Sequence, residues 1–288
     1  MPRVATISDI IKVYRPRNPS SHKGDFGHTL LIGGSIGKMG AIQLASNACL
    51  RTGAGLTTAC IPQIGYPILQ SSLPEVMVEL SDNENHVHRI PDLKPYNALG
   101  VGPGLGTHED SQFMIRDLLK GSEIPMVIDA DGLNCIAKNP GWLNYFSPGT
   151  ILTPHPKEFD RLFGDHQTEE QRLATAEAKA AAYSITIVLK SHHTHICLAN
   201  GTSWQNSTGN VGLAKGGSGD VLTGVIASLL GQKYSPADAA LLGVFIHGLA
   251  ADQAAKAISN ESMIASDVIH HLSDAFMVLK NNLAVDGE

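Results

Sequence analysis

A glycine-rich segment that leads directly into an apolar, helix-compatible stretch is the part of this sequence best suited to chemistry. It reads Gly216, Gly217, Ser218, Gly219 and Asp220. Glycine permits a tight turn, and the unpaired amides and positive dipole end of the following helix favour a bound anion. Asp220 adds a carboxylate that binding alone does not need, and its place near the helix start predicts an ionised side chain. A phosphate cradle beside a base indicates phosphoryl-transfer chemistry.

Other unusual residues follow predicted strands. Gly102 to Gly106 permits close approach of a ligand, although a purely structural turn explains it nearly as well. Asp129 and Asp131 close a strand, and we expect one of them to face a ligand or Mg²⁺ and the other to cap the next helix. The two aspartates could also both be caps or turn formers. His155 stands between two prolines, and such rigidity favours binding or positioning over a core role.

Standard nucleotide and metal motifs are absent. Residues 102–107 lack the last glycine of a dinucleotide fingerprint, and residues 32–39 lack the first glycine and the Ser/Thr of a P-loop. Lys190, at the end of a strand, could neutralise a phosphate or lie in solvent. His192, His193 and His195 resemble a metal cluster by number, but hairpin alternation places them on opposite faces, so we do not expect a metal there.

The elements that must position these residues alternate between strands and helices. Strand 29–32, helix 39–51 and strand 56–60 form a βαβ unit, which implies parallel pairing. The sequence further predicts strands at 97–101, 125–129, 150–153 and 185–189 and helices at 109–120 and 168–183. It also predicts a hairpin around Asn200-Gly201, a long helix capped by Ser235, and a last helix capped at Ser266-Asp267. The pattern predicts an α/β fold with a mostly parallel central sheet, helices on both faces, and ligands at the carboxyl ends of the strands.

Composition is typical of a globular enzyme. The chain has 288 residues, 43% of them hydrophobic and 17% charged, with a net charge of −6. That charge gives no footprint for nucleic acid or an anionic membrane. The four cysteines lie far apart in apolar surroundings, which predicts buried free thiols. With no signal-peptide core and no run long enough to span a bilayer, we expect a cytoplasmic protein.

Several of these motifs together resemble the ADP/ATP-dependent NAD(P)H-hydrate dehydratases. The resemblance rests on residues 22–27, 32–41, 50–56, 102–106, 129–131, 152–156 and 216–220, in the same order as in the family. It implies a ribokinase-like fold and a hydro-lyase that converts the S-form of NADHX or NADPHX to NADH or NADPH. ADP would be the cosubstrate and would be hydrolysed to AMP and phosphate, with ATP as the alternative. Mg²⁺ would bridge the nucleotide phosphates.

The resemblance also implies residue roles. The catalytic residue is Asp220; the residues that contact the hydrated dinucleotide are Ala41, Gly104, His155 and Asp220; those around the nucleotide are Lys190, Ser191, His192, His193, Thr194 and Gly219; the anion hole is formed by Gly216, Gly217, Ser218 and Gly219. Two departures stand out, namely Ser191-His192-His193 where relatives carry glycine and small residues, and Ser218 where threonine is usual. The metal ligands are not identified. Replacing Gly217 by Val is expected to damage activity without much effect on the core.

The remaining expectations concern organisation. We expect one ribokinase-like domain over residues 1–288 with no fused epimerase domain, a separate NAD(P)HX epimerase as its partner in the pathway, and a homotetramer, as in relatives. A ribokinase-like kinase for a small alcohol shares the fold, the glycine loop and the aspartate, and is the main alternative. A nucleotide-sensing protein with a dead site is disfavoured because Asp220 is present. The preferences for ADP or ATP and for NADHX or NADPHX stay open.

Overall fold

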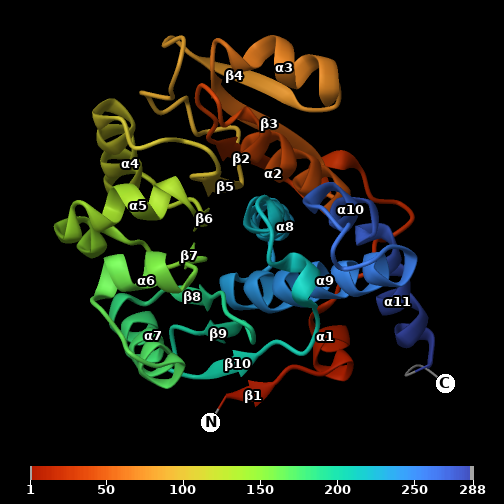
Figure 1. The fold of residues 1–288 in the computed structure, drawn as a ribbon. Coiled ribbons are helices and arrows are strands. Elements are labelled where there is room, and N and C mark those ends of the chain that lie inside the picture. The colour runs from red at the N-terminus through yellow and green to blue at the C-terminus, as the bar shows by residue number, and fades with distance from the viewer. Residues whose placement is uncertain (1, 286–288) are drawn as a thin grey trace.

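One ten-stranded sheet organises the chain in the computed structural model, which describes residues 2–285 (Figure 1). The strands, in chain order, are β1 (Arg3–Val4), β2 (His28–Ile32), β3 (Leu56–Pro62), β4 (Met77–Ser81), β5 (Ala98–Val101), β6 (Met126–Ile128), β7 (Thr150–Leu152), β8 (Thr186–Leu189), β9 (His195–Cys197) and β10 (Ser203–Gln205). Their order across the sheet is β1-β10-β9-β8-β7-β6-β5-β2-β3-β4. All neighbours pair in parallel except β9, which runs antiparallel to β8 and β10. The prediction of a mostly parallel sheet is confirmed.

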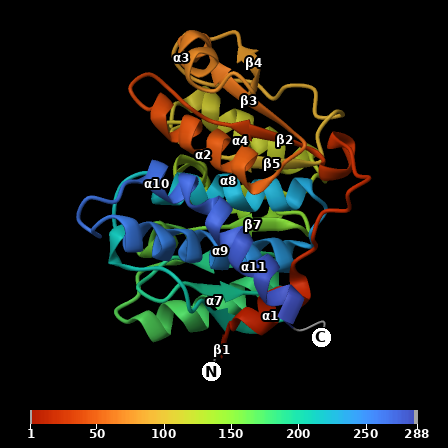
Figure 2. The same ribbon diagram turned by 90° about the vertical axis from the view of Figure 1, so that its right-hand side faces the viewer.

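Helices cover both faces of this sheet (Figure 2). Each face has its own hydrophobic cluster. The first cluster lies under α1 (Ile7–Val13), α2 (Met39–Thr52), α3 (Gly65–Ser72), α8 (Ser218–Gly231), α9 (Pro236–Ala257), α10 (Ala265–His270) and α11 (Leu272–Val285). The second lies under α4 (Glu109–Gly121), α5 (Asp131–Ala137), α6 (Pro156–Phe163) and α7 (Glu169–Tyr183). Short 3-10 turns occur at Lys23–Phe26, Pro140–Tyr145 and Val211–Leu213. Parallel strands need such crossover helices, which explains the layered arrangement.

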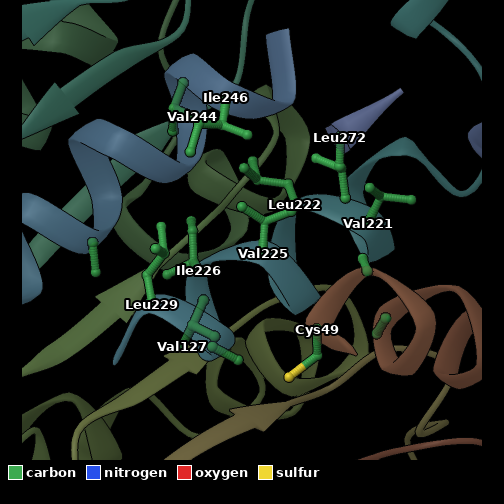
Figure 3. Packing of buried hydrophobic residues seen from close by; sticks show 14 of the residues in the cluster. Cys49, Val127, Val221, Leu222, Val225, Ile226, Leu229, Val244, Ile246 and Leu272 are labelled. Carbon is green, nitrogen blue, oxygen red and sulfur yellow. The ribbon is translucent and has the colours of Figure 1, made fainter. Parts of the chain in front are cut away.

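Helix α8 lies in the middle of the first layer, between α2 and α9 (Figure 1). Its apolar side chains pack against α9, α2 and the sheet, as Figure 3 shows for Val221, Leu222, Val225, Ile226 and Leu229. Gly224 allows α2 to approach closely, because a Cβ there would lie 2.0 Å from the carbonyl oxygen of Ala45. The helix that begins at the glycine loop is therefore held on all sides by the core.

The register of the sheet brings neighbouring strand ends level. Ile32 pairs with Val101, Val101 with Ile128, and Ile128 with Leu152. The loops that follow these four residues therefore start side by side at the carboxyl edge of the sheet, where α/β folds bind ligands.

Most sequence-based element predictions are confirmed, including the hairpin, where Gly201 has a φ of 80°. The predicted cap of the long helix is also confirmed, since the Ser235 hydroxyl accepts the amide of Asp238 at 3.1 Å. The last-helix prediction is wrong in detail. The cap position is Ile264, and Asp267 is the third helical residue, whose carboxylate accepts the amide of Ile264 at 2.8 Å. The sequence analysis missed β1, α1, α3 and β4.

Two further expectations concern cysteines and membranes. All four cysteines are free and buried, as predicted. Within residues 2–285, no helix combines the length and apolar character that crossing a bilayer requires.

Candidate functional site

Asp129, the residue after β6, is the centre of a buried polar network at the carboxyl edge of the sheet. Its Oδ1 accepts a hydrogen bond from Lys190 Nζ at 2.8 Å, and its Oδ2 accepts one from the Thr223 hydroxyl at 2.8 Å. Asp129 is 1% exposed. A carboxylate buried this deeply needs such partners, because an unpaired charge in the interior is strongly unfavourable. The network thereby joins the ends of β6 and β8 to the first turns of α8.

Asp220 lies beside this network and has an unusual acidity. Burial raises the pKa of Asp220 to about 7, the nearby Asp129 carboxylate acts in the same direction, and Lys190 opposes it. Its carboxylate has no hydrogen-bond partner within the described part of the chain. The expectation that the helix start keeps Asp220 fully ionised is therefore wrong, because desolvation and a like charge outweigh the helix dipole. A carboxylate with a pKa near neutrality is well suited to accept and release a proton.

The glycine loop forms the start of α8. Gly217 is the N-cap residue with a φ of 95°, so the first amides of the helix face the end of the loop without intrahelical partners. A Cβ on Gly219 would lie 3.2 Å from Lys190 Nζ and 3.4 Å from Asp129 Oδ2. The loop therefore places its amide groups next to a lysine and a carboxylic acid, which is an arrangement able to hold a phosphoryl group.

One expectation about this loop is wrong. A Cβ on Gly217 would lie 2.7 Å from Leu44 Cδ1 and 2.9 Å from the Cβ of Ala265, and the positive φ adds strain. Replacing Gly217 by Val therefore disturbs the packing of α2 and α10 as well as the site. Gly216 is the contrasting position, since nothing lies within 4 Å of a Cβ built there.

The second carboxylate of the pair, Asp131, faces a different group of residues. Its Oδ2 accepts the amide of Gly106 at 2.9 Å and Lys38 Nζ at 3.0 Å. It is the first residue of α5, and the cap position is Ala130, which has no capping side chain and a φ of 49°. The prediction that one aspartate caps the next helix therefore fails. Asp131 instead ties the loop after β5 to the start of α2.

The residues expected to contact the dinucleotide lie along these loops. A Cβ on Gly104 would lie 3.1 Å from the Cβ of Ala41, so these two residues are neighbours. His155 is the N-cap of α6, where its Nδ1 accepts the amides of Lys157 at 3.1 Å and Glu158 at 3.3 Å. Burial lowers the pKa of His155, so the imidazole is neutral at pH 7. The histidine is therefore fixed in position by its own helix, with its ring half exposed.

The residues expected around the nucleotide divide into two groups. Lys190 and Gly219 belong to the Asp129 network, whereas Ser191, His192, His193 and Thr194 form the turn between β8 and β9. His192 and His193 are exposed, and their ring centroids lie 4.5 Å apart. The Ser191 hydroxyl bonds to the carbonyl oxygen of His193, which closes the turn. This turn borders the site next to Lys190.

Two polar residues near the loop were missed in the sequence. Thr223 lies one turn after Gly219, where its hydroxyl bonds both Asp129 and the Gly219 carbonyl oxygen, so helical spacing from the loop was the available signal. His247 of α9 is buried beside the Ser218 backbone, and burial together with the positive charge of Lys190 lowers its pKa to about 4. Its Nε2 has no hydrogen-bond partner within residues 2–285. No local pattern marks His247 in the sequence.

The architecture agrees with that of known ribokinase-like proteins. A ribokinase-like superfamily protein from Enterococcus faecalis superposes with a TM-score of 0.81 at 28% identity, covering 97% of this chain and 95% of that chain. A crystal structure of the ADP/ATP-dependent NAD(P)H-hydrate dehydratase from Bacillus subtilis, co-crystallised with ATP/Mg²⁺, gives a TM-score of 0.85 at 30% identity, covering 96% of this chain and 98% of that one. The predicted fold class is confirmed.

Sequence comparison identifies the family. Residues 29–274 match the family model described as NAD(P)H-hydrate dehydratase, and the chain belongs to that family. It is 36% identical over 246 residues to the ADP-dependent (S)-NAD(P)H-hydrate dehydratase of Neisseria meningitidis serogroup B, covering 83% of this chain and 81% of that protein. It is 38% identical over 266 residues to the bifunctional NAD(P)H-hydrate repair enzyme of Moorella thermoacetica, covering 89% of this chain. The chain spans about half the length of such bifunctional relatives, 50% in that case.

Proposed function

We propose that this protein catalyses the nucleotide-dependent dehydration of (S)-NADHX and (S)-NADPHX to NADH and NADPH, with conversion of ADP to AMP and phosphate. The observation that carries the proposal is the position of Asp220, whose pKa is about 7 and which follows the glycine loop near the Asp129–Lys190 pair. The names of relatives such as the Neisseria enzyme support the same reaction.

The first step is phosphoryl transfer to the hydroxyl group of the hydrate. Hydroxide is a poor leaving group, whereas phosphate leaves readily. The hydroxyl oxygen attacks the terminal phosphorus of ADP, the bond to AMP breaks, and Asp220 accepts the hydroxyl proton. The amides at the start of α8 stabilise the charge that develops on the transferred phosphoryl group, and Lys190 lies close enough to add a positive charge.

The second step is elimination. The bond between carbon and the phosphorylated oxygen breaks, and the neighbouring carbon loses a proton, which the departing phosphate takes up. The electron pair of that C–H bond forms the double bond of the reduced nicotinamide. The protein's task here is to orient the ring and keep the phosphate in place. We assign Ala41, Gly104 and His155 to the dinucleotide, and the turn from Lys190 to Thr194 with Gly219 to the AMP part of the cosubstrate.

Mg²⁺ fits this site as part of a nucleotide complex. Asp129 and Asp131 provide carboxylate oxygens of the kind that Mg²⁺ prefers, but each is already held by a lysine. Such sites usually bind Mg²⁺ through one or two carboxylates and the substrate phosphates. When bound, the ion would neutralise phosphate charge, and the protein residues named above would orient the nucleotide.

The proposal is tested by incubating the purified protein with enzymatically prepared NADHX, Mg²⁺ and either ADP or ATP. Return of the near-ultraviolet absorbance of reduced nicotinamide, with one phosphate released per NADH formed, is the expected result. Formation of a stable phosphorylated alcohol without that absorbance would instead support the alternative, a kinase for a small alcohol. Separate runs with each nucleotide and with NADPHX establish the two preferences.

We further propose that the chain acts as one ribokinase-like unit in a cytoplasmic homotetramer, and that an epimerase activity supplies the S-form of the hydrate. The match to about half of the bifunctional repair enzymes supports the link to an epimerase. Light scattering of the purified chain measures the assembly. We expect the chain to convert only half of a racemic hydrate, and addition of an epimerase to bring the conversion to completion. This result would show that the chain acts on the S-form alone.

A further inference from the structure

Two histidines and an aspartate converge at the rim of the sheet, away from the Asp129 network. His86 Nε2 lies 3.2 Å from Asp110 Oδ2, and His108 Nδ1 lies 3.4 Å from the same oxygen. The two imidazole rings are stacked, with centroids 3.9 Å apart. One possible ligand atom from each of the three residues lies within 4.8 Å of the other two. Within residues 2–285, no other group of three His, Cys, Asp or Glu residues brings its ligand atoms this close.

The backbone around these residues is well fixed. The Asn83 side chain accepts the amides of Asn85 at 2.9 Å and His86 at 3.1 Å, and Ser35 forms a β-bridge with His86. The Ser111 hydroxyl, fully buried, donates to the carbonyl oxygen of Val87 at 2.6 Å. Because Ser111 follows Asp110 and Val87 follows His86, this bond ties the two ligand-bearing segments together. The cluster is therefore held by the fold rather than by chance contacts of flexible side chains.

The donor set has a clear preference. Two imidazole nitrogens and one carboxylate oxygen suit Zn²⁺ and neighbouring divalent transition ions, whereas Mg²⁺ prefers oxygen ligands only. Bonds of about 2.0–2.2 Å from an ion to each donor would span the 3.2 and 3.4 Å that separate the two imidazole nitrogens from Asp110 Oδ2. His108 Nδ1 also accepts a long hydrogen bond of 3.3 Å from the Asp110 amide, which an ion would replace.

A cavity of about 410 Å³ adjoins the cluster, lined by Ser35, Ile36, Asn83, Asn85, His86, Leu105, Gly106 and His108. An ion held by three protein donors has at least one open coordination position. The cavity also reaches Gly106, the end of the glycine loop after β5, so an ion here would be near that loop without sharing a ligand with the Asp220 site.

We propose that His86, His108 and Asp110 form a binding site for one divalent transition-metal ion of the Zn²⁺ class, separate from the Mg²⁺–nucleotide site. An ion would bind the neutral form of each imidazole, through the nitrogen that faces Asp110. The bound ion links the segment after β4 to the start of α4.

The test is a Zn²⁺ titration of tag-free protein by calorimetry, with metal content measured after dialysis. We expect one Zn²⁺ per chain, and an affinity at least about tenfold weaker in each of His86→Gln, His108→Asn and Asp110→Asn. Asn is a good N-cap residue, so His108→Asn removes the imidazole while keeping the cap of α4. Zn²⁺ should also raise the melting temperature of the wild type but not of the three variants.

The matched control is the double variant His192→Ala/His193→Ala. It removes two adjacent, exposed histidines that are not part of the His86–His108–Asp110 group. Zn²⁺ binding should be unchanged in this control. Absence of saturable Zn²⁺ binding to the wild type, or equal binding by the three cluster variants with unchanged melting temperatures in the absence of metal, would overturn the proposal.

Discussion

Asp129 and Asp131 are separated by one residue and each binds a lysine, but the two pairs have different surroundings. Asp129 is 1% exposed and bonds Lys190, which itself is largely buried. Asp131 bonds Lys38, whose side chain is 53% exposed. The first pair lies against Asp220 and the glycine loop, whereas the second joins a loop to a helix start near solvent. The Asp129–Lys190 pair therefore influences the pKa of Asp220, whereas Asp131 and Lys38 connect the loop after β5 to the start of α2.

Ala130 separates the two carboxylates. Its φ of 49° is rare for a residue with a side chain, and it turns the chain so that Asp129 and Asp131 diverge. Such conformations persist only where the surroundings hold them, and they are concentrated at functional sites. The contrast between the two ion pairs therefore depends on a single strained residue.

The largest expected effect comes from replacing the group that the Asp129 pair influences. Asp220→Asn should lower kcat by about 10²- to 10⁴-fold, because an amide cannot accept the hydroxyl proton. Nucleotide affinity, measured by calorimetry, should change little. Near-normal turnover would rule out Asp220 as the base.

Stability offers a control for that variant. The pKa of Asp220 is raised in the folded state to about 7, so its contribution to stability is present at low pH and is lost as the pH rises through about 7. Asp220→Asn avoids this loss. The variant should therefore be more stable than the wild type at pH 8, and the difference should vanish below about pH 4.

The next effect compares the two aspartates directly. Asp129→Asn should lower the free energy of unfolding by about 3 kcal/mol, because it leaves Lys190 buried without a counter-charge. Asp131→Asn should cost about 1 kcal/mol or less, since the partner Lys38 is exposed to solvent. Urea denaturation at pH 7 measures both. Equal losses would show that burial does not distinguish the pairs.

A smaller effect is expected from crowding the buried pair. Gly219→Ala places a methyl group 3.2 Å from Lys190 Nζ, which should displace the lysine and lower kcat/KM by about tenfold. Gly216→Ala is the matched control, because the added methyl group meets open space. Similar kinetics in the two variants would argue that Lys190 does not need its observed position.

The smallest effect concerns pH. Below about pH 7, kcat/KM should fall because Asp220 becomes protonated. Removing the negative charge of Asp129 lowers the pKa of Asp220, so this fall should move to lower pH in Asp129→Asn. Asp131→Asn should move it less, because Asp131 contributes less to the raised pKa. A larger shift in Asp131→Asn would reverse the proposed division between the two pairs.

The parts of the site that are local in sequence could be predicted. The glycine loop, Asp220 and the loops at the strand ends are recognisable because each is a short run with a distinctive composition. The sheet, its helices and the hairpin follow from hydrophobic periodicity and turn residues. Even there, a capping signal misled, since Asp267 belongs to the third helical position rather than to the cap.

The long-range parts could not be predicted. Lys190 is 61 residues from Asp129 and Thr223 is 94, so no spacing rule connects them. The acidity of Asp220 depends on burial and on Asp129, which only the folded chain brings together, whereas the sequence shows only the helix start. His86 is likewise brought close to His108 and Asp110 only in the folded chain, where it follows β4, the edge strand that the sequence analysis missed.

The burial of α8 has a consequence for motion. All residues of this helix except Gly219 and Asp220 are buried, so the amides from Val221 onward should exchange with solvent deuterium only on global unfolding. Asp220, the proposed base, therefore belongs to a helix that is buried along its length except at its N-terminal end. Entry of substrate and exit of phosphate must then depend on displacement of the surrounding loops, while the glycine loop and its aspartate stay still.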